Sequence, residues 1–408
     1  MTVFGSRWIE APEHAVELPP ASLPSGFRAA GVAAGLKPQG LDVGVLISDE
    51  ADTVSAARFT TNARVGAPVV ASREADLRRL RAVVANSGGS NTGDGQRGLQ
   101  TARATQSLAA ELLDIGADQV GVASTGVIGT ELPREPLLAG VRAAAGQLGS
   151  DADQFSRAIL TSDSSPKRAS IEVTLPSGRV RVAAQVKGAG MISPRFATMF
   201  CFVETDARLS PETVDLLTGV WVKRSFDRIS VDGQLSTSDT VFVLANGASR
   251  VQIEPETDDE LRLGEAVDAM LRALALSIVA DGEGARRVGR IVVRGASDRV
   301  EPVARAIANS PLVKTALHGG DPNFGRILQA AGMAYPSGDH FVVDLEIEDR
   351  LVVSAGEALL DDLHELEPLV QGDEVQYTLT LPGSGGETEV FFSDLSPEYV
   401  RFNAEYTS

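Results

Sequence analysis

The chain has 408 residues, a net charge of −18 at neutral pH and a single cysteine, Cys201. Hydrophobic residues make up 43% and charged residues 23% of the sequence, a composition typical of a globular protein with more than one domain and not of a disordered chain. The acidic balance argues against nucleic-acid or anionic-membrane binding, since phosphate contacts require clustered Lys and Arg, and one cysteine excludes a disulfide within the chain. Between Phe200 and Phe202, Cys201 is more typical of a buried packing residue than of a nucleophile. The sequence shows no signal peptide and no apolar run near the ~20 residues of a membrane span, so we expect a cytoplasmic protein.

Helical periodicity alternates with strand-like runs along the first two thirds of the chain. The predicted helices span residues 73–84, 97–117, 135–149, 211–226 and 257–282. The predicted strands span residues 43–47, 81–86, 120–124, 198–206 and 240–246.

Two hairpins and a smaller α+β unit complete the predicted elements. The hairpins cover residues 171–186 and 375–392, each turning through Gly and Ser. Residues 288–408 mix strands with a helix that Ser297 would cap and a second helix from about Arg326. These elements predict a mixed α/β fold in which helices and sheets pack in layers.

Six segments are rich in small and polar residues and lack hydrophobic periodicity. They are residues 85–95, 123–133, 187–199, 229–240, 281–287 and 317–326. Each alone is typical of a turn, but six of them, most at the ends of strands or helices, suggest loops that converge on one site. The segments contain no P-loop or dinucleotide-binding glycine pattern, and the four histidines lack metal-ligand spacing. No GxSxG nucleophile elbow occurs either.

Thr198 follows a glycine-rich approach, KGAGMISPRFA (187–197), and opens an apolar run. A threonine hydroxyl needs an adjacent base to act as a nucleophile. If the chain is cut just before it, the new α-amino group, with a pKa of ~7.7–8.0, can take the hydroxyl proton. Pro194 and the small Ala197 fit such a self-cleavage, but the residues alone favour the plainer interpretation that Thr198 begins a core strand.

The stretch KGAGMISPRFATMFCFVETDA (187–207) closely resembles the self-cleavage segment of the ornithine acetyltransferase (glutamate N-acetyltransferase) family of arginine biosynthesis. Further segments are similar to family segments, in the family's order over roughly residues 40–408. They are ASTGVIGTELP, ISVDGQLSTSDT, DGEGARR, LVKTALHGGDPNFGR and the C-terminal RFNAEYTS. The resemblance implies an N-terminal-nucleophile-like α/β fold with a smaller C-terminal α+β domain.

The resemblance also implies roles for individual residues. Thr198 would be the nucleophile, and the Ala197-Thr198 bond would be cleaved. Thr125 and Gly126 match the family's oxyanion-hole pair. The positions that match substrate-binding residues are Thr161, Lys187, Thr198, Glu283, Asn403 and Ser408. Lys187 would suit a substrate carboxylate and Glu283 a substrate ammonium group.

Cleavage would give chains 1–197 and 198–408, the second starting with the nucleophile strand and helices over 198–287 and ending with the α+β domain over 288–408. The resemblance further implies a ping-pong reaction that moves an acetyl group from N-acetylornithine to glutamate through an acetyl-Thr198 ester, without metal or cofactor. Some family members use acetyl-CoA as a donor, and an (αβ)₂ heterotetramer is implied.

Several loops depart from the family pattern. The first loop reads NSGGSNTGDG, and later ones read DGQLSTSD, EGARR and DPNF. These changes flank the expected nucleophile and oxyanion pair and leave three alternatives open. They are a paralogue that acts on other N-acyl amino acids, an amidohydrolase that passes the acyl group to water, and an uncleaved ligand-binding protein.

Overall fold

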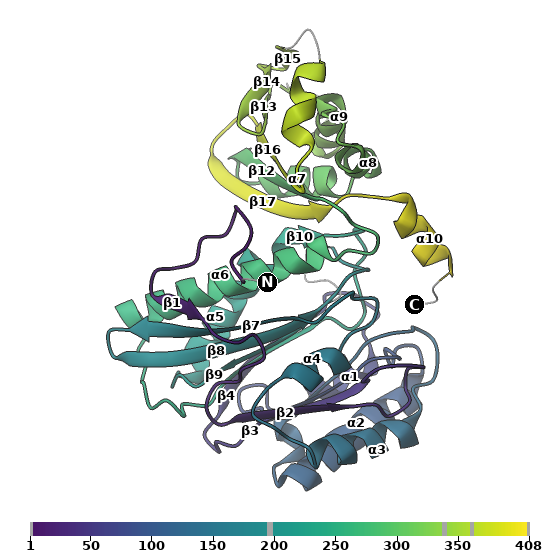
Figure 1. Ribbon diagram of the computed structural model, residues 1–408, viewed down its shortest axis with the longest axis vertical. Coiled ribbons are helices and arrows are strands. Elements are labelled where there is room, and N and C mark those ends of the chain that lie inside the picture. Colours follow the sequence, from purple (N-terminus) through teal and green to yellow (C-terminus); the bar gives the residue numbers. More distant parts are fainter. Residues whose placement is uncertain (1–2, 194–198, 337–340, 360–362, 406–408) are drawn as a thin grey trace.

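The computed structural model describes residues 3–193, 199–336, 341–359 and 363–405. Two sheets pack face to face with helices on their outer faces, and a third sheet with its own helices lies beyond one helical layer (Figure 1). This arrangement confirms the predicted class of α and β elements in layers. Across the described ranges, no helix is both long and apolar enough to cross a membrane.

The first sheet has six strands in the order β1-β7-β8-β9-β11-β4. Their bounds are β1 Ala15–Glu17, β4 Val54–Phe59, β7 Lys167–Leu175, β8 Gly178–Lys187, β9 Phe200–Thr205 and β11 Thr240–Ala245. Strands β7 and β8 form the predicted hairpin over 171–186, and β9 and β11 run parallel at the centre. In the register of β8 and β9, Lys187 lies opposite Phe200.

Helices α5 (Pro211–Arg224) and α6 (Asp258–Ala280) cover one face of this sheet (Figure 1). Each begins where a side-chain hydroxyl, Ser210 or Thr257, accepts a hydrogen bond from the amide three residues on, which satisfies a backbone donor of the first turn. Apolar side chains on their inner faces join those of the sheet in one buried cluster, which includes Cys201. The short helix η2 (Phe226–Arg228) follows α5.

The second sheet has four strands in the order β2-β3-β5-β6. Their bounds are β2 Phe27–Val32, β3 Val43–Ser48, β5 Ala82–Asn86 and β6 Val120–Ser124. The helices of this layer are α1 Ala67–Arg73, α2 Gly95–Leu113, η1 Ala117–Gln119, α3 Arg134–Ala145 and α4 Asp153–Ala158. Between the two sheets, Phe155 of α4 and Phe200, Phe202 and Phe242 of the six-stranded sheet pack into a shared core.

The third sheet has seven strands in the order β10-β17-β12-β16-β13-β14-β15. Their bounds are β10 Ile229–Ser230, β12 Val288–Ala296, β13 Asp344–Ile347, β14 Arg350–Ser354, β15 Glu357–Ala358, β16 Glu374–Thr380 and β17 Gly385–Ser393. Its helices are α7 Val300–Ala308, α8 Pro311–Gly319, α9 Phe324–Ala334, η3 Leu363–Val370 and the C-terminal α10 Pro397–Glu405. In Figure 1, α10 leaves this sheet and returns toward the other two layers.

The helix predicted over residues 73–84 is wrong. Helix α1 ends at Arg73, and residues 82–86 form β5, which pairs with β3 on one side and β6 on the other. The leucines and arginines of this segment have helical spacing, but the β-branched Val83 and Val84 are fully enclosed in the sheet. Pairing with two neighbouring strands therefore overrides the local helical pattern.

The hairpin predicted over residues 375–392 is also wrong. Strands β16 and β17 exist, but β12 lies between them, parallel to β16 and antiparallel to β17. Ser297 is likewise not an N-cap, because residues 297–299 form a turn and α7 begins at Val300 with Arg299 at its cap position. The second predicted helix is α9, which begins at Phe324, and α8 was not predicted.

Candidate active site

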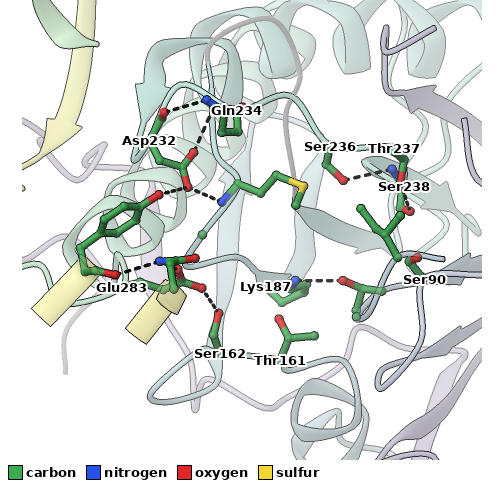
Figure 2. Close-up of a pocket in the computed structure, with 17 residues that line it drawn as sticks. Ser90, Thr161, Ser162, Lys187, Asp232, Gln234, Ser236, Thr237, Ser238 and Glu283 are labelled. Carbon is green, nitrogen blue, oxygen red and sulfur yellow. Dashed lines mark hydrogen bonds between the residues drawn. The ribbon is translucent and has the colours of Figure 1, made fainter. Parts of the chain in front are cut away.

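A cavity of about 140 Å³ lies where loops from all three layers and α10 meet. Every predicted site residue that the structure describes lines it: Thr125, Gly126, Thr161, Lys187, Glu283 and Asn403. Figure 2 labels Thr161, Lys187 and Glu283 among them. The remaining predicted site residues, Ala197, Thr198 and Ser408, lie outside the described residues. The set predicted from the sequence includes positions up to 278 residues apart, and the fold places them together, since Thr125 and Asn403 line the same cavity.

Thr125 and Gly126 directly follow β6, so the sheet delivers them to the cavity at the end of a buried strand. Gly126 has a φ of +125°, a conformation that favours glycine. A Cβ atom there would come within 2.7 Å of the backbone of Gly88 and Gly89. The close approach of the first polar loop therefore requires glycine at this position.

Lys187 is the last residue of β8 and is only 3% exposed. Its ammonium group donates a hydrogen bond to the Thr125 hydroxyl oxygen, 3.1 Å away. Burial lowers the pKa of Lys187, and the nearby carboxylate of Asp163 opposes this effect. Because Thr125 Oγ1 accepts from Lys187, its own proton is free to donate into the cavity.

Glu283 supplies a carboxylate at the opposite end of the cavity (Figure 2). It follows α6, and its two oxygens accept hydrogen bonds from the Ser162 hydroxyl at 2.7 Å and the Asn403 amide at 2.8 Å. Gly190 packs against this carboxylate so closely that a Cβ atom would lie 2.4 Å from it. These contacts hold the half-buried carboxylate at the cavity wall, where it would suit a cationic ligand group.

Asp232 shapes the loop that follows Lys187. Its carboxylate accepts from the amides of Met191 at 2.6 Å and Ile192 at 2.9 Å, and the Tyr399 hydroxyl donates to it at 3.4 Å. Burial raises the pKa of Asp232 despite these donors. Asp232 thus ties the glycine-rich loop, the third sheet and α10 to one wall of the cavity.

Asp239 lies directly before β11 and is 1% exposed. Its Oδ1 accepts from the Met199 amide at 2.9 Å, and the amide of Thr240 donates to the Met199 carbonyl at 3.1 Å. Within the described residues Oδ2 has no hydrogen-bond partner. Burial raises the pKa of Asp239 well above its usual value, and the Met199 amide and the Lys187 ammonium group oppose this effect. Met199 is the residue after the predicted nucleophile, so Asp239 fixes the backbone beside it.

Five of the six polar segments contribute residues to the cavity, as the sequence predicted, but the segment over 317–326 contributes none among the described residues. Its His318 instead bonds to the buried Asp394, 2.7 Å away, and Asn323 caps α9. This segment therefore holds the third sheet together instead of lining the site.

Other residues of the cavity were not singled out from the sequence. Among them are Ser90, Ser162, Asp232, Ser236, Thr237, Ser238 and Tyr399. All but Ser162 and Tyr399 lie in polar segments already recognised, so their hydroxyl and carboxyl groups were visible signals, and Ser162 directly follows Thr161. Tyr399 carries no such signal, because the packing of α10 alone brings it to the wall.

Two further expectations concern metal and thiol chemistry. Among the described residues there is no group of three or more His, Cys, Asp or Glu side chains that could hold a metal ion. Cys201 is fully buried in the core beneath α5 and α6, and burial raises the pKa of its thiol well above the usual value. The prediction of a packing role for Cys201 is confirmed.

Comparison with known proteins identifies the family. The model of the ArgJ family matches residues 28–408. The chain belongs to this family. It is 42% identical over 95% of its length to the arginine biosynthesis bifunctional protein ArgJ of Rhodopirellula baltica, covering 96% of that protein. It is also 40% identical over 94% of its length to the glutamate N-acetyltransferase of Methanocaldococcus jannaschii, covering 98% of that protein.

Family membership confirms the resemblance drawn from the sequence motifs and the expectation of an acyltransferase. Among solved structures, the ornithine acetyltransferase of Mycobacterium tuberculosis complexed with ornithine is 35% identical, with a TM-score of 0.41. That match covers 44% of this chain and 98% of that one.

Proposed function

We propose that this chain is a self-cleaving acyltransferase that moves an acetyl group from N-acetylornithine to glutamate. The observation that carries the proposal is the convergence of Thr125, Gly126, Lys187 and Glu283 on one cavity. Membership in the ArgJ family, whose relatives are named for arginine biosynthesis and glutamate N-acetylation, supports the same substrates.

The first step proposed is self-cleavage of the Ala197-Thr198 bond by attack of the Thr198 hydroxyl on the carbonyl carbon of Ala197. Hydrolysis of the resulting ester leaves Thr198 with a free α-amino group, which then serves as the base for its own hydroxyl. Lys187 lies opposite Phe200 in the sheet, and Phe200 is two positions after Thr198 along the chain. Strand β9, which begins two residues after Thr198, is therefore the neighbour of β8, which ends in the cavity.

In the transfer reaction, the Thr198 hydroxyl attacks the acetyl carbonyl carbon, and the tetrahedral oxyanion receives hydrogen bonds from the Thr125 hydroxyl and the Gly126 amide. The α-amino group of Thr198 passes the proton it has taken to the departing amine of ornithine, and an acetyl-Thr198 ester remains. The α-amine of glutamate then attacks this ester and releases the hydroxyl. The Lys187 ammonium orients Thr125, since it donates to the same oxygen at 3.1 Å.

Substrate selection follows from the charges at the two parts of the cavity. Glu283, held by Ser162 and Asn403, suits an ammonium group, and Lys187 and the hydroxyls of Ser236–Ser238 suit a carboxylate. We further propose that the cleaved chains, 1–197 and 198–408, assemble as an (αβ)₂ heterotetramer in the cytoplasm and that residues 288–408 form a distinct C-terminal domain.

Mass spectrometry of small-molecule products tests the function. The purified chain is incubated with N-acetylornithine, with and without glutamate. We expect ornithine and N-acetylglutamate in equal amounts only when glutamate is present. Release of acetate without N-acetylglutamate would instead identify an amidohydrolase, and no conversion would contradict enzymatic transfer. A parallel incubation with acetyl-CoA and glutamate shows whether the chain accepts that donor.

A further inference from the structure

Three paired charged residues, Asp163, Lys167 and Asp281, lie next to the cavity but do not line it. Lys167, the first residue of β7, pairs with Asp163 at 2.7 Å and with Asp281 at 2.5 Å. The side chains of Lys167 and Asp163 are 3% and 0% exposed, and that of Asp281 is 17% exposed. Burying three charges costs free energy unless each is paired. We therefore asked what these residues do beside the cavity.

Asp163 reaches two segments of the cavity wall through hydrogen bonds. Its Oδ1 accepts from the amide of Gly188 at 2.7 Å, and its Oδ2 accepts from the amide of Thr161 at 3.1 Å. Gly188 follows Lys187 in the chain. One buried carboxylate thus fixes the backbone directly after Lys187 and at Thr161, the lysine and threonine predicted to hold the substrate.

Asp281 connects the same group to the third segment. Its carboxylate accepts from the amide and the hydroxyl of Ser164, and it lies two residues before Glu283. The segments that carry Thr161, Lys187 and Glu283 are therefore joined through the triad of Asp163, Lys167 and Asp281. A shift in any one would move substrate-facing groups on another.

Asp163 also sets the charge balance around Lys187. The charged groups that act on Lys187 are Asp163, Asp239 and Glu283, which raise its pKa, and Lys167, which lowers it; Lys37 faces the same region. Among these charges Asp163 has the largest effect on Lys187. Lys167 and Lys187 in turn hold the pKa of Asp163 at about 2 against its burial, so Asp163 stays ionised at any pH above that value.

We propose that Asp163 is a positioning residue that keeps the Lys187 ammonium charged and aligned with Thr161, so that the cavity selects ligands that carry a carboxylate. The inference rests on the proposed function only for the choice of ligand, an amino acid such as ornithine. Asp163 acts through Lys187 and does not itself touch the ligand.

Ornithine binding, measured by calorimetry between pH 6 and 9, tests the proposal without requiring turnover. The variants are Asp163→Asn, which keeps an acceptor for Gly188 but loses the charge, and Asp163→Glu, which keeps the charge. Each variant is compared with the wild type at the same pH, because titration of the ligand's own amines then cancels. We expect the Asp163→Asn affinity to fall increasingly as pH rises, with its alkaline limb displaced downward by about one pH unit or more. Asp163→Glu should restore part of the wild-type profile.

Glu389→Gln is the matched control. Glu389 also pairs with two cations, Arg272 at 2.6 Å and Arg290 at 2.7 Å, but lies away from the cavity. This control should keep the wild-type pH profile. Asp281→Asn, on the more exposed side of the triad, should shift the limb in the same direction by less and serves if Asp163→Asn fails to fold.

The outcomes separate the inference from the proposed function. Identical pH profiles for the wild type, Asp163→Asn and Asp281→Asn, with cooperative unfolding retained, would overturn the positioning role. A wild type that binds ornithine with the expected pH profile but transfers no acetyl group would support the positioning role and contradict the proposed reaction. A wild type that does not bind ornithine would contradict both.

Discussion

Replacing Gly190 with alanine should weaken substrate binding while leaving the fold intact. A Cβ atom at this position would lie 2.4 Å from the carboxyl carbon and one oxygen of Glu283, and 2.6 Å from the other oxygen. Since carbon contacts settle near ~3.5 Å, the carboxylate must move by about 1 Å. That movement stretches its hydrogen bonds to Ser162 and Asn403, now 2.7 and 2.8 Å, beyond hydrogen-bonding range.

The substitution should weaken substrate binding and not the fold, because the displaced group is the end of a flexible, half-buried side chain. A hydrogen bond to a charged group contributes about 1.5–3 kcal/mol, so losing the substrate ammonium contact should raise KM for N-acetylornithine about 10- to 150-fold. Steady-state kinetics measures KM, and thermal unfolding should show little change. Gly332→Ala is the control, since nothing lies within 4 Å of a Cβ there. An unchanged KM for Gly190→Ala would refute the assignment of Glu283 as the ammonium partner.

Four further variants, at three positions, test other parts of the site and core. Thr125→Val keeps the branched shape but removes the hydroxyl, so kcat should fall about 10²- to 10³-fold with little change in KM, and full activity would remove Thr125 from the oxyanion hole. Asp239→Asn keeps an oxygen acceptor for the Met199 amide and should self-cleave like the wild type in a gel time course, whereas Asp239→Leu, which has no acceptor, should be slow. Equal damage from both would show that the acceptor oxygen alone does not explain the role of Asp239. Glu204, fully buried on β9, has its pKa raised to about 8, so it retains a proton that the unfolded chain releases near pH 4.5. Wild-type stability relative to Glu204→Gln should therefore decline as pH rises from 4.5 to 8, and a constant difference in unfolding free energy would contradict this.

The cavity was largely predictable from the sequence because its residues come from short polar segments whose order matched a family. Thr125, Lys187 and Glu283 each lie at or just after the end of a regular element, where the hydrophobic periodicity ends and polar residues begin. The role of Asp163 was not predictable, although Thr161, two residues before it, was predicted to bind the substrate. Its significance lies in hydrogen bonds to Gly188 and Thr161, and only the folded arrangement of β7 and β8 creates them.

The errors in the fold have a common physical cause. Alternation over residues 374–393 correctly indicates two strands, but it carries no information on which strand pairs with which, and β12 separates them. The segment over 73–84 has helical spacing because Leu77 and Leu80 face the core from the irregular segment that precedes β5. In both cases non-local pairing decides the outcome, and a single sequence shows only local pattern.

The central claim, that Thr198 becomes an N-terminal nucleophile, is tested most directly by N-terminal sequencing and intact mass of the purified chain. The account predicts two fragments, 1–197 and 198–408, with a new terminus that reads TMFCFV, and one full-length chain for Thr198→Ala. A wild-type protein that transfers acetyl groups to glutamate yet remains a single chain of 408 residues would contradict the claim.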